Sequence, residues 1–280
     1  MNPTFGLSPS EIAVLRSLGE GKRTPKEVAA ELGVSPQLLS RHIRSLREKG
    51  LVFMERAGLR KIVWISDTKH ASLFRRILSD FGHMKLERQI SASALEILSC
   101  LAFSDQMKRS EIAAAASVSP RTVQSVLQRF REVGILRRDA AGTFGISDRF
   151  SPLAEFAVEF RRYSNLKTAT ALYPDAVVVW EKDRDFIIKT SNAKELDGFR
   201  LTAFSAYHRF GVQLLLVGHY HFHSAEKRKL RAEDVLIHTL LLGPLDGRDM
   251  TALLLLWKRT EGGIHLRRLM AKAEEYGVAD

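Results

Sequence analysis

The 280-residue sequence predicts a fold that is mostly α with small β-hairpins and that ends in a C-terminal α/β domain. Apolar residues recur every three or four positions in several short segments, which is the helical period. An alternating apolar stretch with a turn follows the third of these segments, and the same order of patterns then occurs again. From about Tyr173, strand-like runs alternate with helical ones, as is typical of an α/β domain.

The third helical segment begins at Ser35, whose hydroxyl can accept a hydrogen bond from a free N–H group of the first turn, and the proline after it suits the first helical position. Leu39, Ile43 and Leu46 fall on one face, which we expect to be buried. The opposite face is polar and consists of Gln37, Arg41, Arg44 and Glu48. Gly50 is expected to end the helix, because glycine readily adopts the left-handed backbone found there.

Two capped helices are predicted before this segment and a β-hairpin after it. The helices begin at Ser8-Pro9-Ser10-Glu11 and at Thr24-Pro25-Lys26-Glu27, where Glu follows the capping hydroxyl three residues later. The hairpin is predicted from strands at 51–55 and 61–66 with a turn at Ala57-Gly58. Its tip carries three basic residues, Arg56, Arg60 and Lys61. Three helices and a basic hairpin are the layout of a winged helix-turn-helix domain.

A second copy of this layout follows. Ser35-Pro36 matches Ser119-Pro120 and Gly50 matches Gly134, each at a shift of 84 residues. The expected elements of the second copy are helices at 91–101, at 109–116 and from Pro120, and a shorter hairpin at 137–145. We infer an internal duplication.

Each copy is followed by an amphipathic helix with an apolar stripe, from Leu73 to Phe81 and from Leu153 to Phe160. We expect each stripe to pack on its own domain; pairing with another subunit is the alternative. The predicted fold is thus mostly α with small β wings, as two winged helix-turn-helix domains plus a C-terminal α/β domain. Their predicted boundaries are 1–90, 91–165 and 166–280.

The C-terminal domain has a different character, with 162–172 as its expected connection to the rest. Its predicted strands are 176–180, 186–190 and the buried run 212–217. Its predicted helices are 201–210, 232–242, 250–258 and 264–276.

The charge favours a polyanionic partner, because the formal net charge is +11. Basic residues outnumber acidic ones by 16 to 9 in residues 1–90, by 10 to 8 in 91–165 and by 17 to 15 in 166–280. Cys100 is the only cysteine, so neither an internal disulfide nor a thiolate metal cluster is expected. The first residues do not have the pattern of a secretory signal, and the apolar runs are too short for a membrane span. We therefore expect a cytoplasmic protein.

Residues 27–36 and 40–52, Glu-Val-Ala-Ala-Glu-Leu-Gly-Val-Ser-Pro and Ser-Arg-His-Ile-Arg-Ser-Leu-Arg-Glu-Lys-Gly-Leu-Val, resemble the winged helix-turn-helix of MarR-type and ArsR-type transcriptional regulators. The resemblance implies double-stranded DNA as the partner. It assigns DNA contacts to helix residues and wing residues of the first copy: Gln37, Ser40, Arg41, Arg44, Arg56, Arg60 and Lys61. Amides and guanidinium groups suit such contacts, since they pair with base edges and phosphates.

The matching positions of the second copy are Arg121, Thr122, Gln124, Ser125 and Gln128. This copy is less basic and has a shorter wing, so a structural or dimerising role is the alternative. Residues 200–207, with Gly211-Val212, look faintly like the C-terminal domain of AbiEi-type antitoxin regulators, and no residue roles are transferred from that similarity.

A metal-dependent enzyme is a weaker alternative, suggested by His219-Tyr220-His221-Phe222-His223. On a strand the three imidazoles share one face, but they diverge over roughly 13 Å, so all three cannot reach one ion. A polar strand face or edge explains the pattern more simply. We expect no catalytic residues, metal or cofactor.

The sequence therefore favours a sequence-specific transcriptional regulator with DNA as its partner, a second copy of the chain as a candidate partner, and an effector that the sequence does not reveal. A replication-initiator or chromosome-binding protein is the alternative in the same structural class, because tandem winged helices occur there as well.

Overall fold

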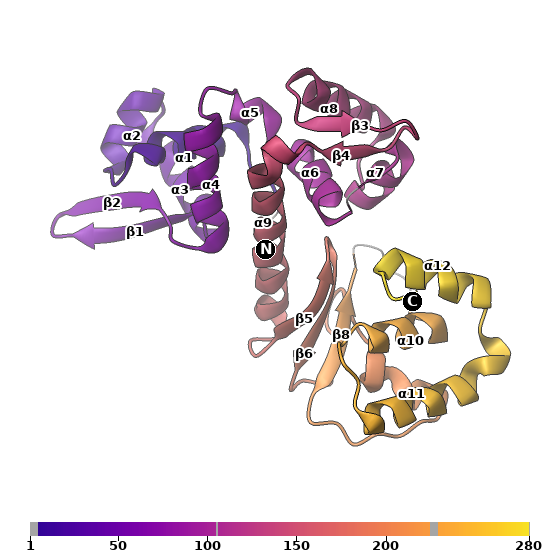
Figure 1. The fold of residues 1–280 in the computed structure, drawn as a ribbon. Coiled ribbons are helices and arrows are strands. Elements are labelled where there is room, and N and C mark those ends of the chain that lie inside the picture. Colours follow the sequence, from indigo (N-terminus) through magenta and orange to yellow (C-terminus); the bar gives the residue numbers. More distant parts are fainter. Residues whose placement is uncertain (1–4, 105, 225–228, 280) are drawn as a thin grey trace. The chain divides into compact units, whose positions relative to one another are not determined.

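The computed structural model describes residues 5–104, 106–224 and 229–279, which fall into two compact units. Unit 1 ends at Ser164 and unit 2 begins at Asn165. The described residues are mostly helical, and their strands form three small antiparallel sheets (Figure 1). No helix among them is both long enough and apolar enough to cross a membrane.

The first half of unit 1 has three helices and a hairpin in the predicted order. They are α1 Pro9–Ser17, α2 Pro25–Leu32, α3 Pro36–Glu48, β1 Val52–Ala57 and β2 Arg60–Ile65, with the 3-10 turn η1 Leu18–Glu20 after α1. The predicted caps are confirmed: the hydroxyls of Ser8, Thr24 and Ser35 accept hydrogen bonds from the first turns of the three helices. Strand pairing extends to Ala57, the last residue of β1, and Arg60, the first of β2, so the hairpin turn lies at Gly58 and Leu59, one residue later than predicted.

The second half of unit 1 repeats this order of elements. After the short α5 Leu86–Gln89 come α6 Ser93–Phe103, α7 Arg109–Ala116, α8 Pro120–Glu132, β3 Leu136–Arg138 and β4 Phe144–Ile146, followed by η2 Asp148–Phe150. The cap of α8 matches that of α3, because the Ser119 hydroxyl accepts from the Thr122 N–H at 3.1 Å. The second hairpin is shorter, with strands of three residues each.

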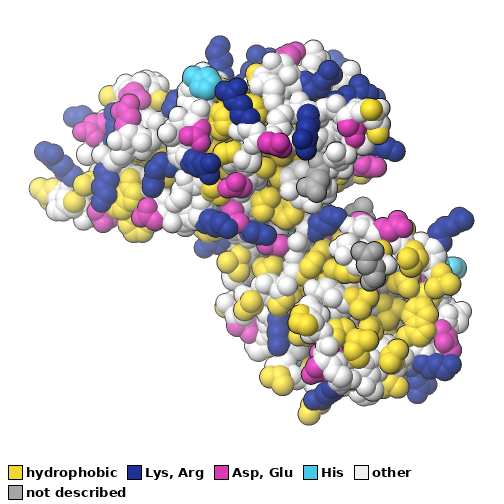
Figure 2. All heavy atoms as spheres, viewed as in Figure 1, with side chains coloured by type: hydrophobic (Ala, Val, Ile, Leu, Met, Phe, Trp, Pro, Cys, Tyr) yellow, Lys and Arg dark blue, Asp and Glu magenta, His cyan; other side chains and the backbone are white. Residues whose placement is uncertain are grey.

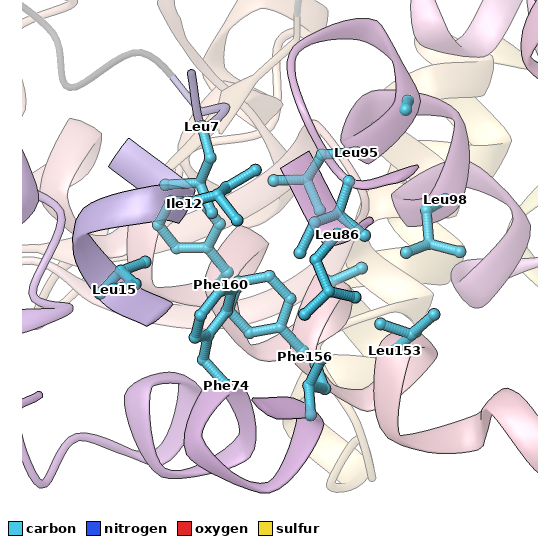
Figure 3. Close-up of a cluster of buried hydrophobic side chains, with 14 of the residues drawn as sticks. Leu7, Ile12, Leu15, Phe74, Leu86, Leu95, Leu98, Leu153, Phe156 and Phe160 are labelled. Atoms are coloured by element: carbon cyan, nitrogen blue, oxygen red, sulfur yellow. The ribbon is translucent and has the colours of Figure 1, made fainter. Parts of the chain in front are cut away.

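Two further helices, α4 Lys69–Phe81 and α9 Ser151–Leu172, join the halves of unit 1. Their apolar stripes pack against each other at Phe74 and Phe156, whose ring centroids are 5.3 Å apart. Phe81 of α4 also stacks on Phe150 of η2, with ring centroids 5.0 Å apart. Figure 3 shows this cluster, in which residues of α1, α4, α5, α6 and α9 surround the labelled Phe156 and Phe160. The boundary expected near residue 90 thus lies inside a continuous core.

Unit 2 contains a four-stranded antiparallel sheet in the order β5-β6-β8-β7. The strands are β5 Val177–Lys182, β6 Asp185–Thr190, β7 Phe199–Leu201 and β8 His219–His223. One face packs on the end of α9 through Tyr173, and the other packs on three helices. These are α10 Ala232–Leu240, α11 Gly247–Thr260 and α12 Leu266–Tyr276, and η4 Glu261–Gly263 lies between the last two.

Three expectations for the C-terminal region are corrected. The predicted strand at 212–217 is wrong: its side chains alternate between core and solvent, with Val217 101% exposed, but its backbone joins no ladder within the described residues. The helix predicted at 201–210 is a 3-10 helix, η3 Ala203–Phe210. It begins later than predicted because the chain up to Leu201 pairs with β8 in the sheet. The expected connection 162–172 is part of α9.

Candidate nucleic-acid interface

Helix α3 is attached to unit 1 by its apolar face. Leu39, Ile43 and Leu46 are each at most 3% exposed and lie in the core, as their spacing predicted. Burial of three such side chains contributes on the order of 5 kcal/mol or more to stability. The opposite face of the helix is therefore held outward.

A buried ion pair fixes the far end of α3. The Lys49 ammonium and the Ser45 hydroxyl donate to Glu11 Oε1 of α1, at 2.7 and 2.6 Å. Burial alone raises the pKa of Glu11, but these hydrogen bonds, with that from the Ser8 N–H, outweigh burial and leave this pKa below its ordinary value. Glu11 is thus a buried carboxylate that ties α3 to α1.

The four predicted contact residues of α3 all face solvent. Gln37, Ser40, Arg41 and Arg44 are exposed, and within the described part of the chain their side chains make no hydrogen bond or ion pair. Their donors and acceptors are therefore available to a ligand. Leu38, 40% exposed, adds an apolar contact among them.

The first hairpin carries the three predicted wing residues. Arg56 and Lys61 face each other across the strands, and Arg60 pairs with Ala57 beside the turn. All three side chains are exposed, and the described residues offer them neither an ion pair nor a hydrogen-bond partner. Figure 2 shows Lys and Arg side chains in dark blue along this hairpin. Exposed cations without an ion-pair partner among the described residues suit contacts to phosphates.

Sequence reasoning missed Lys22, which joins the outer surface of the hairpin. Its ammonium lies 4.3 Å from the centroid of the Trp64 ring, and Trp64 packs on Phe53, which is 52% exposed. Spacing along the chain gives no sign of this contact. It arises because Arg23 pairs with Val63 as an isolated bridge and brings the preceding loop beside β2.

The residues predicted to match in the second half of unit 1 are less free. Arg121, Gln124 and Ser125 are exposed, but the Gln128 amide donates to Glu132 at 3.1 Å. Thr122 is half-buried, and its hydroxyl lies 2.8 Å from that of Ser119 in the helix cap. The α8 surface therefore offers fewer unengaged polar groups than that of α3.

The histidine strand has structural contacts instead of a shared ligand point. His221 is fully buried and its Nε2 donates to the Asn192 carbonyl at 2.8 Å, while His223 stacks on Phe186 at 4.8 Å. Burial lowers the pKa of both imidazoles. Strand β8 lies inside the sheet, so the edge interpretation is wrong. Among the described residues no group of three or more His, Cys, Asp or Glu side chains could hold a metal ion.

The exposed polar face of α3 and the basic hairpin together form a surface that suits a polyanion. Comparison with curated proteins found no match to the chain. A model of the MarR family matches residues 5–59, a segment that runs from just before α1 to the tip of the β1–β2 hairpin. Residues 5–59 of this chain are therefore similar to the MarR family over the three helices and the first strand of the hairpin.

Proposed function

We propose that the chain is a sequence-specific regulator of transcription that binds double-stranded DNA in the cytoplasm and has no enzymatic activity. The observation that carries this proposal is a set of seven exposed polar or basic side chains that make no hydrogen bond or ion pair within the described residues. Five of them lie in the segment that matches the MarR family, and Arg60 and Lys61 follow directly after it. A protein folded for its own stability alone has no need to keep five cations on one surface without an ion-pair partner.

In the proposed mechanism α3 enters the major groove. The guanidinium groups of Arg41 and Arg44 suit the O6 and N7 atoms of guanine, and Gln37 suits adenine. Arg56 and Lys61 hold the flanking phosphates and set the register without reading sequence.

We extend the proposal to the second half of unit 1, as a second winged helix whose Arg121 and Gln124 contact a neighbouring groove with lower affinity. The support is the repeated order of helices and hairpin, together with the capping of α8 by Ser119. The shorter hairpin and the engaged Gln128 support the lower rank.

We also propose that two copies of the chain associate through unit 2. Helix α11 exposes Leu254 and Leu255 at 61% and 51%. It has Asp249 in its first turn and Lys258 and Arg259 in its last. Antiparallel packing of two α11 helices would bury the leucines and bring opposite charges together, the self-complementary pattern of a two-fold interface. Sedimentation of the DNA complex gives the number of chains bound.

The test of the DNA assignment starts with a duplex that the full-length protein selects from a random library. Arg41→Ala is expected to weaken binding to this duplex by about 1–3 kcal/mol, and to relax preference at one base position. Lys61→Ala is expected to weaken all sequences alike and to flatten the salt dependence by about one unit of slope. Gel-shift titrations at several salt concentrations measure both effects.

Arg267→Ala, which removes an exposed arginine of unit 2, is the matched control and should leave binding unchanged. If Arg41→Ala binds as tightly as the wild type at matched salt, α3 does not read the sequence. Genome-wide mapping of the bound sites is a separate test: a regulator is expected upstream of genes, and an initiator is expected at a repeat array.

A further inference from the structure

The tip of the β1–β2 hairpin presents an isolated apolar side chain to solvent. Leu59 is 95% exposed, the highest value for any large hydrophobic residue that the structure describes in unit 1. Gly58 before it has φ +61°, and strand pairing resumes at Arg60. The glycine at the first central position allows the tight two-residue turn that pushes Leu59 to the end of the ribbon.

The surroundings of Leu59 are cationic. Arg60 follows it directly and pairs with Ala57. Arg56 and Lys61 face each other in the pair after that, further from the turn. Figure 2 shows hydrophobic and basic side chains together at the end of this hairpin. A leucine among solvated cations gains nothing for folding, because the described residues bury almost none of its surface.

The second hairpin lacks this feature. Its tip carries Asp139, which accepts hydrogen bonds from Thr143, and then two alanines and Gly142. It has no bulky apolar group, and at its tip Asp139 stands next to Arg138, whose guanidinium lies beside Gly142. An apolar tip is therefore a property of the more basic hairpin alone within the described part of unit 1.

We propose that Leu59 acts as a wedge that enters the minor groove, inserts between two base pairs and kinks the DNA. The proposal rests on the DNA binding proposed above and adds DNA bending to it. A two-residue turn is narrow enough for a groove about 6 Å wide, and flanking cations hold phosphates on both sides. Proteins that insert Leu, Ile or Phe in this way unstack one step and bend the duplex by about 20–90°.

The experiment uses the full-length protein and the duplex that it selects, with 2-aminopurine placed in turn at each step that flanks the α3 site. Saturating wild-type protein is expected to raise the fluorescence at one step, where stacking is lost, and to shorten the end-to-end distance measured by energy transfer. Leu59→Ala is expected to abolish both signals. Its salt slope should equal that of the wild type, because no charge is removed.

Leu59→Met, a bulky apolar replacement, should restore the fluorescence signal, and Leu215→Ala, which shortens an 89% exposed leucine of unit 2, should leave it unchanged. Wild-type protein that saturates the duplex without raising the signal at any step overturns the wedge and leaves the DNA assignment intact. So does a Leu59→Ala signal equal to that of the wild type. If the wild type retains no duplex even at low salt, the proposed function itself fails, and the wedge with it.

Discussion

Gly50 and His70 hold the C-terminal end of α3 at the scale of single residues. Gly50 has φ +68°, and a Cβ atom there would lie 2.5 Å from the Tyr163 ring, so this position requires glycine for two reasons. His70 Nε2 donates to the Lys49 carbonyl at 2.9 Å, and the imidazole packs on Tyr163 with ring centroids 4.5 Å apart. Helices α4 and α9 therefore supply the contacts that satisfy the last turn of α3.

His70 predicts a pH dependence of stability. Burial lowers its pKa by more than the Lys49 carbonyl and Glu159 raise it, so the unfolded chain takes up a proton near pH 6.5 that the folded chain does not. The contribution of His70 to stability is thus complete above about pH 6.5 and is lost as the pH falls below that value. We expect the free energy of unfolding to fall less between about pH 7.5 and pH 5.5 in His70→Gln than in the wild type, as measured by denaturant titration at both pH values.

His221 and His223 have pKa values shifted in the same direction. The wild type and His70→Gln both contain these two histidines, so their effect cancels in this comparison. An equal loss of stability in the two proteins would show that His70 takes up its proton in the folded state.

At the scale of elements, the packing of α3 on α1 depends on one buried carboxylate. The side chains of Glu11 and Lys49 are 5% and 10% exposed. Glu11→Gln leaves the Lys49 ammonium buried without its partner, which is expected to cost about 3–5 kcal/mol. Urea denaturation followed by circular dichroism measures this loss.

Glu20→Gln provides the control, because Glu20 is 84% exposed and 4.0 Å from Arg23. A pair of this kind contributes about 0–1 kcal/mol, so the two substitutions should differ severalfold. A loss at Glu11 no larger than that at Glu20 would mean that water reaches the buried pair.

At the scale of the whole molecule, unit 1 has one core and is expected to unfold as one body. Phe156 is fully buried beside Phe74 of α4, and the cluster that contains both includes residues of every long helix of unit 1 (Figure 3). Removing this side chain therefore weakens both halves at once, whichever half carries it in the sequence.

Phe156→Ala is expected to cost about 3–5 kcal/mol. Hydrogen exchange should show reduced protection in α1 and α3 as well as in α6 and α8. The matched variant Phe186→Ala removes a buried ring of unit 2 and should leave protection in unit 1 unchanged. Loss confined to α6 and α8 would show that the two halves open independently.

Much of the helical structure followed from interactions between residues close in sequence. The hydroxyls of Ser8, Thr24 and Ser35 bond to N–H groups three residues ahead, and the spacing of Leu39, Ile43 and Leu46 predicted which face is buried. The outward face of α3 is simply the remainder of that helix. Its predicted DNA contacts stay a prediction, because exposure shows availability and not binding.

The tertiary structure decided what depends on residues far apart in sequence. The apolar run 212–217 has the alternation of a strand, but it pairs with no strand among the described residues, which its own residues could not reveal. The packing of α4 on α9 merges two halves that the repeated sequence pattern made look separate. The contact of Lys22 with Trp64 depends on the bridge between Arg23 and Val63. Capping and amphipathic spacing are local and can be read from the sequence, whereas strand pairing and shared cores depend on which surfaces meet after the chain has folded.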